Sequence, residues 1–123
     1  MLFLLFRPIS SLVNAPMRQQ DAIIQASCSE SNPCMFSIQG KTYSYSYLTV
    51  YDLTRTDQIK YAINPSSAPS SWDSSDLTTG TSQDLDRIFV TPTPVQSLYV
   101  LVKPSTSKTI SARAGYAMTY CRA

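Results

Sequence analysis

The residue types present limit the chemistry that this chain can perform. It has 123 residues and no histidine. Histidine is the commonest general base and transition-metal ligand, so triad hydrolysis and histidine-based zinc sites are excluded. No Gly-x-Ser-x-Gly sequence, Gly-rich phosphate loop or His-Glu-x-x-His motif occurs. The sequence predicts a protein that is not an enzyme and that carries no cofactor.

Four aspartates offer one alternative, because they could together bind a calcium ion. Calcium prefers oxygen ligands in irregular loops, although the spacing here matches no known calcium-binding loop. In the other interpretation these carboxylates only form turns and keep the loop soluble. General acid catalysis is disfavoured because a Ser-rich loop does not desolvate a carboxyl group. The candidate calcium ligands are Asp73, Asp76, Asp84 and Asp86.

Aromatic residues are the second group with a binding potential. The stretch KTYSYSYLTVYDL, residues 41–53, places Tyr43, Tyr45, Tyr47 and Tyr51 on one face of a strand. We predict that these rings pack in the core or between subunits, with a sugar-stacking platform as the alternative. Trp72, the only tryptophan, lies in a long Ser-rich loop. It either stacks on a ligand or plugs one end of the domain.

The three cysteines are Cys28, Cys34 and Cys121. We predict one disulfide that joins Cys121 to Cys28 or to Cys34. Closing a loop of about 90 residues contributes about 4 kcal/mol in the chain-entropy model. The remaining thiol is then free or intermolecular, and three reduced cysteines in an intracellular protein is the alternative.

Alternating apolar and polar residues predict strands along most of the chain. Residues 98–102 are apolar on both faces, which predicts a central strand. The last strand has one apolar face and one polar face. A 64–84 loop rich in Ser and Pro separates two of the strands. We therefore expect an all-β antiparallel β-sandwich or jelly roll, with strands at 35–39, 41–53, 58–63, 85–91, 98–102 and 109–121.

Length and charge limit the domain organisation and the possible partners. Residues 28–123 are predicted to form one domain, preceded by an apolar arm or uncleaved signal-like segment at 1–27. The arm is too short to span a bilayer. A net charge of +2 without a basic cluster excludes nucleic acid as a partner. Ser/Thr/Pro-rich segments predict O-linked glycans on an exported protein. The apolar arm residues are Leu2, Phe3, Leu4, Leu5, Phe6, Leu12 and Val13.

The order of segments from about residue 39 to 120 resembles the bacterial pre-peptidase C-terminal domain family. The segments that carry the resemblance are DQIKYAI at 57–63, TGTSQD at 79–84 and PVQSLYVLV at 94–102, followed by a final alternating strand. The resemblance implies a small extracellular β-sandwich jelly roll, attached to exported proteins. It also implies a role in anchoring, binding or export rather than in catalysis.

The function expected from the sequence is structural. Only 15% of the residues are charged, and an apolar arm precedes the domain. Together these features predict a homo-oligomer or polymer. In this hypothesis the arm packs on a neighbouring subunit of an extracellular filament, surface layer or virion coat. The alternative is a carbohydrate-binding or adhesive module that uses the tyrosine face or Trp72. Both hypotheses place the protein outside the cell or at its surface.

Overall fold

The computed structural model describes residues 11–81 and 85–118, and these residues form nine β-strands and no helix. The predicted all-β class is confirmed. Five of the six predicted strands begin within one residue of the position that the sequence suggested. The strands are β1 (Val13–Pro16), β2 (Ile23–Cys28), β3 (Cys34–Ile38), β4 (Ser44–Leu53), β5 (Gln58–Ile63), β6 (Thr78–Thr79), β7 (Leu85–Val90), β8 (Leu98–Lys103) and β9 (Lys108–Met118).

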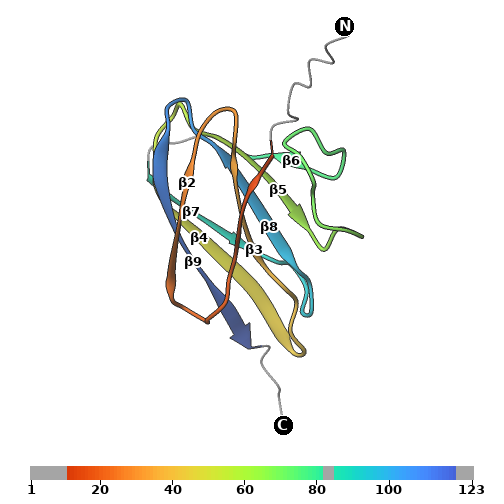
Figure 1. Ribbon diagram of the computed structural model, residues 1–123. Helices are drawn as coiled ribbons and strands as arrows, with labels where there is room; N and C mark the ends of the chain where they lie inside the picture. Colours follow the sequence, from red (N-terminus) through yellow and green to blue (C-terminus); the bar gives the residue numbers. More distant parts are fainter. Residues whose placement is uncertain (1–10, 82–84, 119–123) are drawn as a thin grey trace, which may run out of the picture.

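The strands form two sheets that pack face to face as a β-sandwich (Figure 1). The five-stranded sheet has the order β1-β3-β8-β5-β6, and the four-stranded sheet has the order β2-β9-β4-β7. Neighbouring strands are antiparallel, except that β1 runs parallel to β3. Since β1 and β2 belong to different sheets, the turn that joins them crosses from one layer to the other.

The core lies between the two sheets. Alternate residues point inward, as the pleat of a strand requires. Leu48 and Val50 of β4 lie opposite Ala114 and Ala112 of β9, so that small and large side chains meet across the ladder. The predicted apolar face of the last strand is confirmed at Ile110 and the two alanines. The five-stranded sheet contributes Phe36, Ile38, Ile59, Leu98, Val100 and Val102 to the same cluster.

The outer face of the five-stranded sheet is also covered. Tyr99 and Leu101 of β8 are buried there beneath Trp72 of the loop that follows β5, so the predicted central strand is confirmed. Trp72 is only 7% exposed. The Nζ atoms of Lys60 and Lys103 lie 4.8 and 5.1 Å from its ring centre, and Lys60 Nζ donates a hydrogen bond to the Trp72 carbonyl at 2.9 Å. Trp72 is thus a plug for its own loop, not a ligand-stacking residue.

The tyrosine face of β4 points away from the core, so its predicted placement in the core is wrong. Ser44 and Ser46 are buried in its place, ahead of Leu48 and Val50. The reason is the corner at 91–97, which packs on these serines. Ser46 Oγ donates to the Gln96 carbonyl at 2.7 Å, and the Val95 N–H donates to the Ser44 carbonyl at 2.9 Å. The two serines are therefore buried beneath the backbone of that corner.

The predicted boundary between an arm and a domain at residues 27 and 28 does not match the strands. β1 and β2 lie before it and are strands of the two sheets. Leu12 packs against the Trp72 cluster and Val13 against the main core. The other predicted arm residues, Leu2, Phe3, Leu4, Leu5 and Phe6, lie outside the described part. No helix in residues 11–81 and 85–118 is long and apolar enough to cross a bilayer.

Candidate functional site

The outer face of the four-stranded sheet carries several exposed apolar side chains. One row of side chains crosses it from Ile23 of β2, through Arg113 and Thr49, to Ile88 of β7. Ile23, Ile88 and Val90 keep 55, 65 and 54% of their surface exposed. We call this surface the open face and define it by Ile23, Gln25, Tyr45, Tyr47, Thr49, Ile88, Val90, Ser111, Arg113 and Gly115.

Tyr47 is the best-anchored ring of the open face. It pairs with Val90 on one side and with Gly115 on the other. A Cβ atom at Gly115 would come within 2.8 Å of Tyr47 Cζ, so the ring lies directly over the glycine. The Tyr47 hydroxyl donates a hydrogen bond to Asp21 Oδ1 in the turn between β1 and β2. The ring is therefore held across the sheet and presents an apolar surface next to Val90.

The other predicted tyrosines differ in exposure. Tyr45 and Tyr51 are half-buried on β4. Tyr43 is exposed and lies in the turn before β4, where its φ of 59° places it in the left-handed region. The four rings therefore do not share one strand environment, contrary to the expected even row.

Tyr116 occupies the end of the sandwich near the same strands. Its hydroxyl donates to the Gln39 carbonyl at 2.7 Å, and the ammonium group of Lys41 lies 5.3 Å from its ring centre. Desolvation by burial raises the pKa of the Tyr116 hydroxyl above its ordinary value of 10.0. This group is therefore a neutral structural hydrogen-bond donor at physiological pH.

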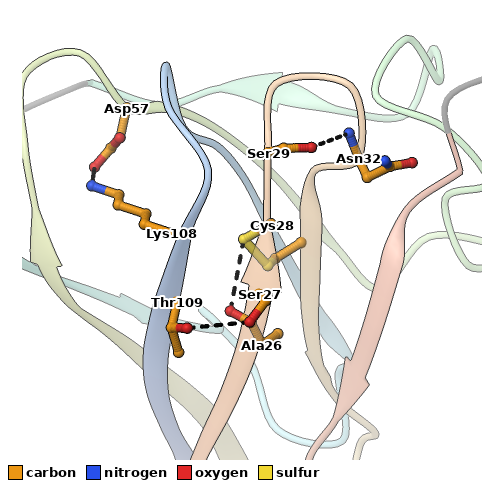
Figure 2. The surroundings of a disulfide bond; sticks show 9 residues. Ala26, Ser27, Cys28, Ser29, Asn32, Asp57, Lys108 and Thr109 are labelled. Carbon is orange, nitrogen blue, oxygen red and sulfur yellow. Dashed lines mark hydrogen bonds and ion pairs between the residues drawn. A yellow bond between two sulfur atoms is a disulfide. The ribbon is translucent and has the colours of Figure 1, made fainter.

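An open pocket of about 630 Å³ lies at the end of the sandwich that carries the disulfide, bounded by β2, β9 and the turns beside them. Its polar groups bond to one another. Lys108 Nζ lies 2.6 Å from Oδ2 of Asp57, a carboxylate only 1% exposed (Figure 2). Ser27 and Thr109 share a hydrogen bond of 3.2 Å. Lys108 is the one cation among the described residues that line the pocket, and its charge is paired with that of Asp57.

The disulfide joins Cys28 to Cys34, so the predicted bond to Cys121 is wrong. Cys28 ends β2 in one sheet and Cys34 begins β3 in the other, which brings their Cα atoms to 5.3 Å, within the range that a disulfide spans. The bond therefore ties the two sheets together at one end. Cys121 lies outside the described residues. A disulfide is typical of proteins that reside outside the reducing cytoplasm.

The predicted calcium ligands do not gather into a site within the described residues. Asp73 and Asp76 are exposed in the loop over the five-stranded sheet, whereas Asp86 accepts a hydrogen bond from the Asp52 N–H at 3.0 Å. Asp84 lies outside the described part. Residues 11–81 and 85–118 contain no group of three or more Cys, Asp or Glu that suits a metal ion. Calcium binding through all four carboxylates stays a prediction.

Sequence reasoning missed Ile23, Ile88 and Val90 as surface residues. A signal was present in β7, whose sequence LDRIFV places Ile88 and Val90 on one face and Phe89 on the other. Phe89 takes the core side, where its ring centre lies 5.4 Å from that of Tyr61. Apolar residues on both faces of a strand indicate either a central strand or an edge strand with an exposed apolar face. β7 is an edge strand of this second kind.

The chain matches no protein-family model, and no curated protein is similar to it in sequence. Among solved structures it is similar to the periplasmic lysozyme inhibitor PliG of Aeromonas hydrophila, an inhibitor of g-type lysozyme. The TM-score is 0.51 at 9% identity, over 86% of this chain and 97% of the inhibitor. This similarity shows a shared fold. The resemblance to the pre-peptidase C-terminal domain stays a prediction.

The predicted function as a self-assembling filament, surface-layer or coat subunit is corrected by these findings. One solved structure that shares this fold is that of an enzyme inhibitor. The described part of the predicted arm contains β1 and most of β2, which are edge strands of the chain's own two sheets. The carbohydrate-binding alternative also loses one basis, because Trp72 is buried.

Proposed function

We propose that this protein is a non-catalytic, protein-binding module that acts outside the cytoplasm and contacts its partner through the open face. The observation that carries the proposal is the difference between the two outer faces. A loop with Trp72 covers the five-stranded sheet, whereas the four-stranded sheet exposes Ile88 and Val90 beside the anchored Tyr47 ring. A contiguous exposed apolar patch on a small domain usually marks an interaction site.

The composition of the open face suits a protein partner. Protein interfaces are enriched in aromatic residues and arginine, and the open face contains Tyr45, Tyr47 and Arg113. Fully burying one Ile or Val side chain contributes about 1.5–3 kcal/mol, so covering the exposed halves of three such residues would contribute roughly 3 kcal/mol. This is enough to support an interface when polar contacts at its rim add to it.

Two further findings support the location and the class of partner. The Cys28–Cys34 disulfide favours an oxidising compartment. The fold is shared with a periplasmic inhibitor of g-type lysozyme, a protein whose task is to bind an enzyme. We therefore propose a secreted hydrolase as the first class of partner to test, with g-type lysozyme as its first member.

The test measures binding of the purified, oxidised protein to g-type lysozyme and to other secreted hydrolases by surface biosensing. The variant Thr49→Glu places a charge in the middle of the open face, where the main chain already pairs with both β7 and β9. The control Ser67→Glu places the same charge on the covering loop, where Ser67 is exposed. We expect Thr49→Glu alone to weaken binding, by about 10-fold or more. Equal binding by both variants, or no binder in the panel, would contradict the proposal.

A further inference from the structure

We infer that the free edge of β7 receives an extended segment of the partner protein as an added strand. The inference rests on the proposed function and specifies how the partner binds. The segment has apolar side chains at alternate positions, and it continues the four-stranded sheet beyond β7. The first step is to establish which main-chain groups point to that edge.

The hydrogen-bond register identifies these groups. The Thr91 N–H donates to the Ser46 carbonyl at 2.9 Å, so residue 91 faces β4. In an antiparallel ladder the main-chain groups of successive residues point to opposite sides. The N–H and C=O groups of Phe89 therefore also face β4, and those of Ile88 and Val90 face away from it. Among the described residues no strand pairs with this side of β7.

The other sheet edges are protected in ways that natural sheets commonly use. β1 contains Pro16, which has no N–H to donate, and β6 has only two residues. The free side of β2 faces β1 across a groove of about 330 Å³ that both strands line. β7 differs, because it has six residues and three exposed aliphatic side chains, of which Ile88 and Val90 share the open face. It is the edge most suited to strand addition.

The same two residues specify the chemistry of the added strand. Ile88 and Val90 point to the open face, beside Thr49 and Tyr47 on the neighbouring strand. Directly opposed side chains on one face of a sheet lie in contact, so the added strand places alternate residues next to Ile88 and Val90. Residues with β-branched or aromatic side chains fit there. The partner segment is therefore recognised by its main chain and by apolar side chains two residues apart.

The test uses a defined probe, namely peptides of about 12 random residues displayed on phage and selected on the oxidised protein. The selected peptides are synthesised and their affinities are measured. Ile88→Pro removes the outward N–H of Ile88, which β4 does not use, so the variant is expected to fold. We expect it to weaken peptide binding by about 10-fold or more, and Ile88→Thr, which keeps the N–H, by less. The control Ser67→Thr, on the exposed loop that covers the other sheet, is expected to change nothing.

A second measurement does not depend on the fold of a variant. Peptide saturation is expected to slow amide hydrogen exchange at Ile88 and Val90 by at least about 10-fold, with little change at Phe89, which is already paired. N-methylation of the peptide at alternate residues is expected to abolish binding in one phase of the alternation and to preserve it in the other. Equal binding to Ile88→Pro, protection in the β1–β2 groove instead, or selection of no peptide would overturn the inference. A dimer that protects these amides without peptide would also overturn it.

The results also separate this inference from the proposed function. If a partner protein loses affinity for Thr49→Glu but binds Ile88→Pro normally, the open face is the interface and strand addition is wrong. If neither variant changes binding, the proposed interface itself is wrong. Loss of affinity in both variants supports both statements.

Discussion

The Cys28–Cys34 disulfide gives the most quantitative prediction. The two cysteines are separated by 6 positions in the sequence. In the chain-entropy model, a loop of this length contributes about 2 kcal/mol to the free energy of unfolding. A bond to Cys121 closes a far longer loop and contributes about 4 kcal/mol in the same model. The size of the effect therefore distinguishes the observed bond from the one that the sequence suggested.

The perturbation is reduction of the disulfide in a Cys121→Ser background. Reduction leaves the buried sulfur atoms in place, so the loss reports mainly the cross-link and not a cavity. Urea denaturation should show that dithiothreitol lowers the free energy of unfolding by about 2 kcal/mol, while the packing of the core stays nearly unchanged. For a domain of this size the melting temperature should fall by roughly 6–10 °C.

The control is the same background with Cys28→Ala and Cys34→Ala, in which dithiothreitol should have no effect. Peptide mapping of the oxidised wild type should recover Cys28 and Cys34 in one cross-linked fragment. A fragment that contains Cys121, or a loss near 4 kcal/mol, would refute the assigned connectivity. A Cys121→Ser protein that does not respond to reduction would refute it as well.

Three further predictions follow from the packing and from the Tyr116 pKa. A Cβ atom at Gly40 would overlap the Val95 carbonyl oxygen, so Gly40→Ala should lower the free energy of unfolding by about 2 kcal/mol. Gly80→Ala, where the nearest side-chain atom is 3.3 Å away, should cost less in the same urea titration. Trp72→Ala should cost about 3–5 kcal/mol because it empties the cover of the five-stranded sheet, and a loss below about 1 kcal/mol in calorimetry would contradict that role. The raised pKa of Tyr116 favours its neutral hydroxyl in the folded state, so the free energy of unfolding should fall as the pH rises above 10.0, where the unfolded chain ionises first. Tyr116→Phe should reduce the slope of stability against pH in that window, and an unchanged slope would argue against the assignment.

The strands that the sequence predicted best are those whose own apolar pattern allows only one placement in the fold. β8 is apolar on both faces, and only a central position with cover on both sides satisfies such a strand. β9 has one apolar and one polar face, so its orientation follows from its pattern. Both predictions needed only local periodicity, and both were confirmed.

For β4, local periodicity does not predict which face is buried. Its two faces carry tyrosines and a mixture of Ser, Leu and Val, and either set satisfies an alternating strand. The choice depends on the corner at 91–97, which bonds to Ser44 and Ser46 from nearly fifty residues away in the chain. Tyrosine can lie flat on an exposed face, as Tyr47 does over Gly115, so an aromatic residue does not by itself mark the core.

The cysteine connectivity and the first two strands were also beyond sequence reasoning. Three cysteines allow three single bonds, and spacing alone does not choose among them. β1 has only four residues, which is too short to show a useful alternation, and it pairs in parallel with β3. The candidate site was missed for a related reason, because exposure of Ile88 and Val90 depends on β7 being the last strand of its sheet.

The position of Trp72 determines what optical spectroscopy will report on this protein. The only tryptophan lies on the five-stranded sheet, with the whole thickness of the sandwich between it and the open face. Its emission should follow detachment of the covering loop and global unfolding, while docking at β7 should leave it unchanged. A titration with a tryptophan-free partner, monitored by intrinsic fluorescence, would thus record no signal even when the partner binds. A shift in emission on binding would show that the two sheets move together.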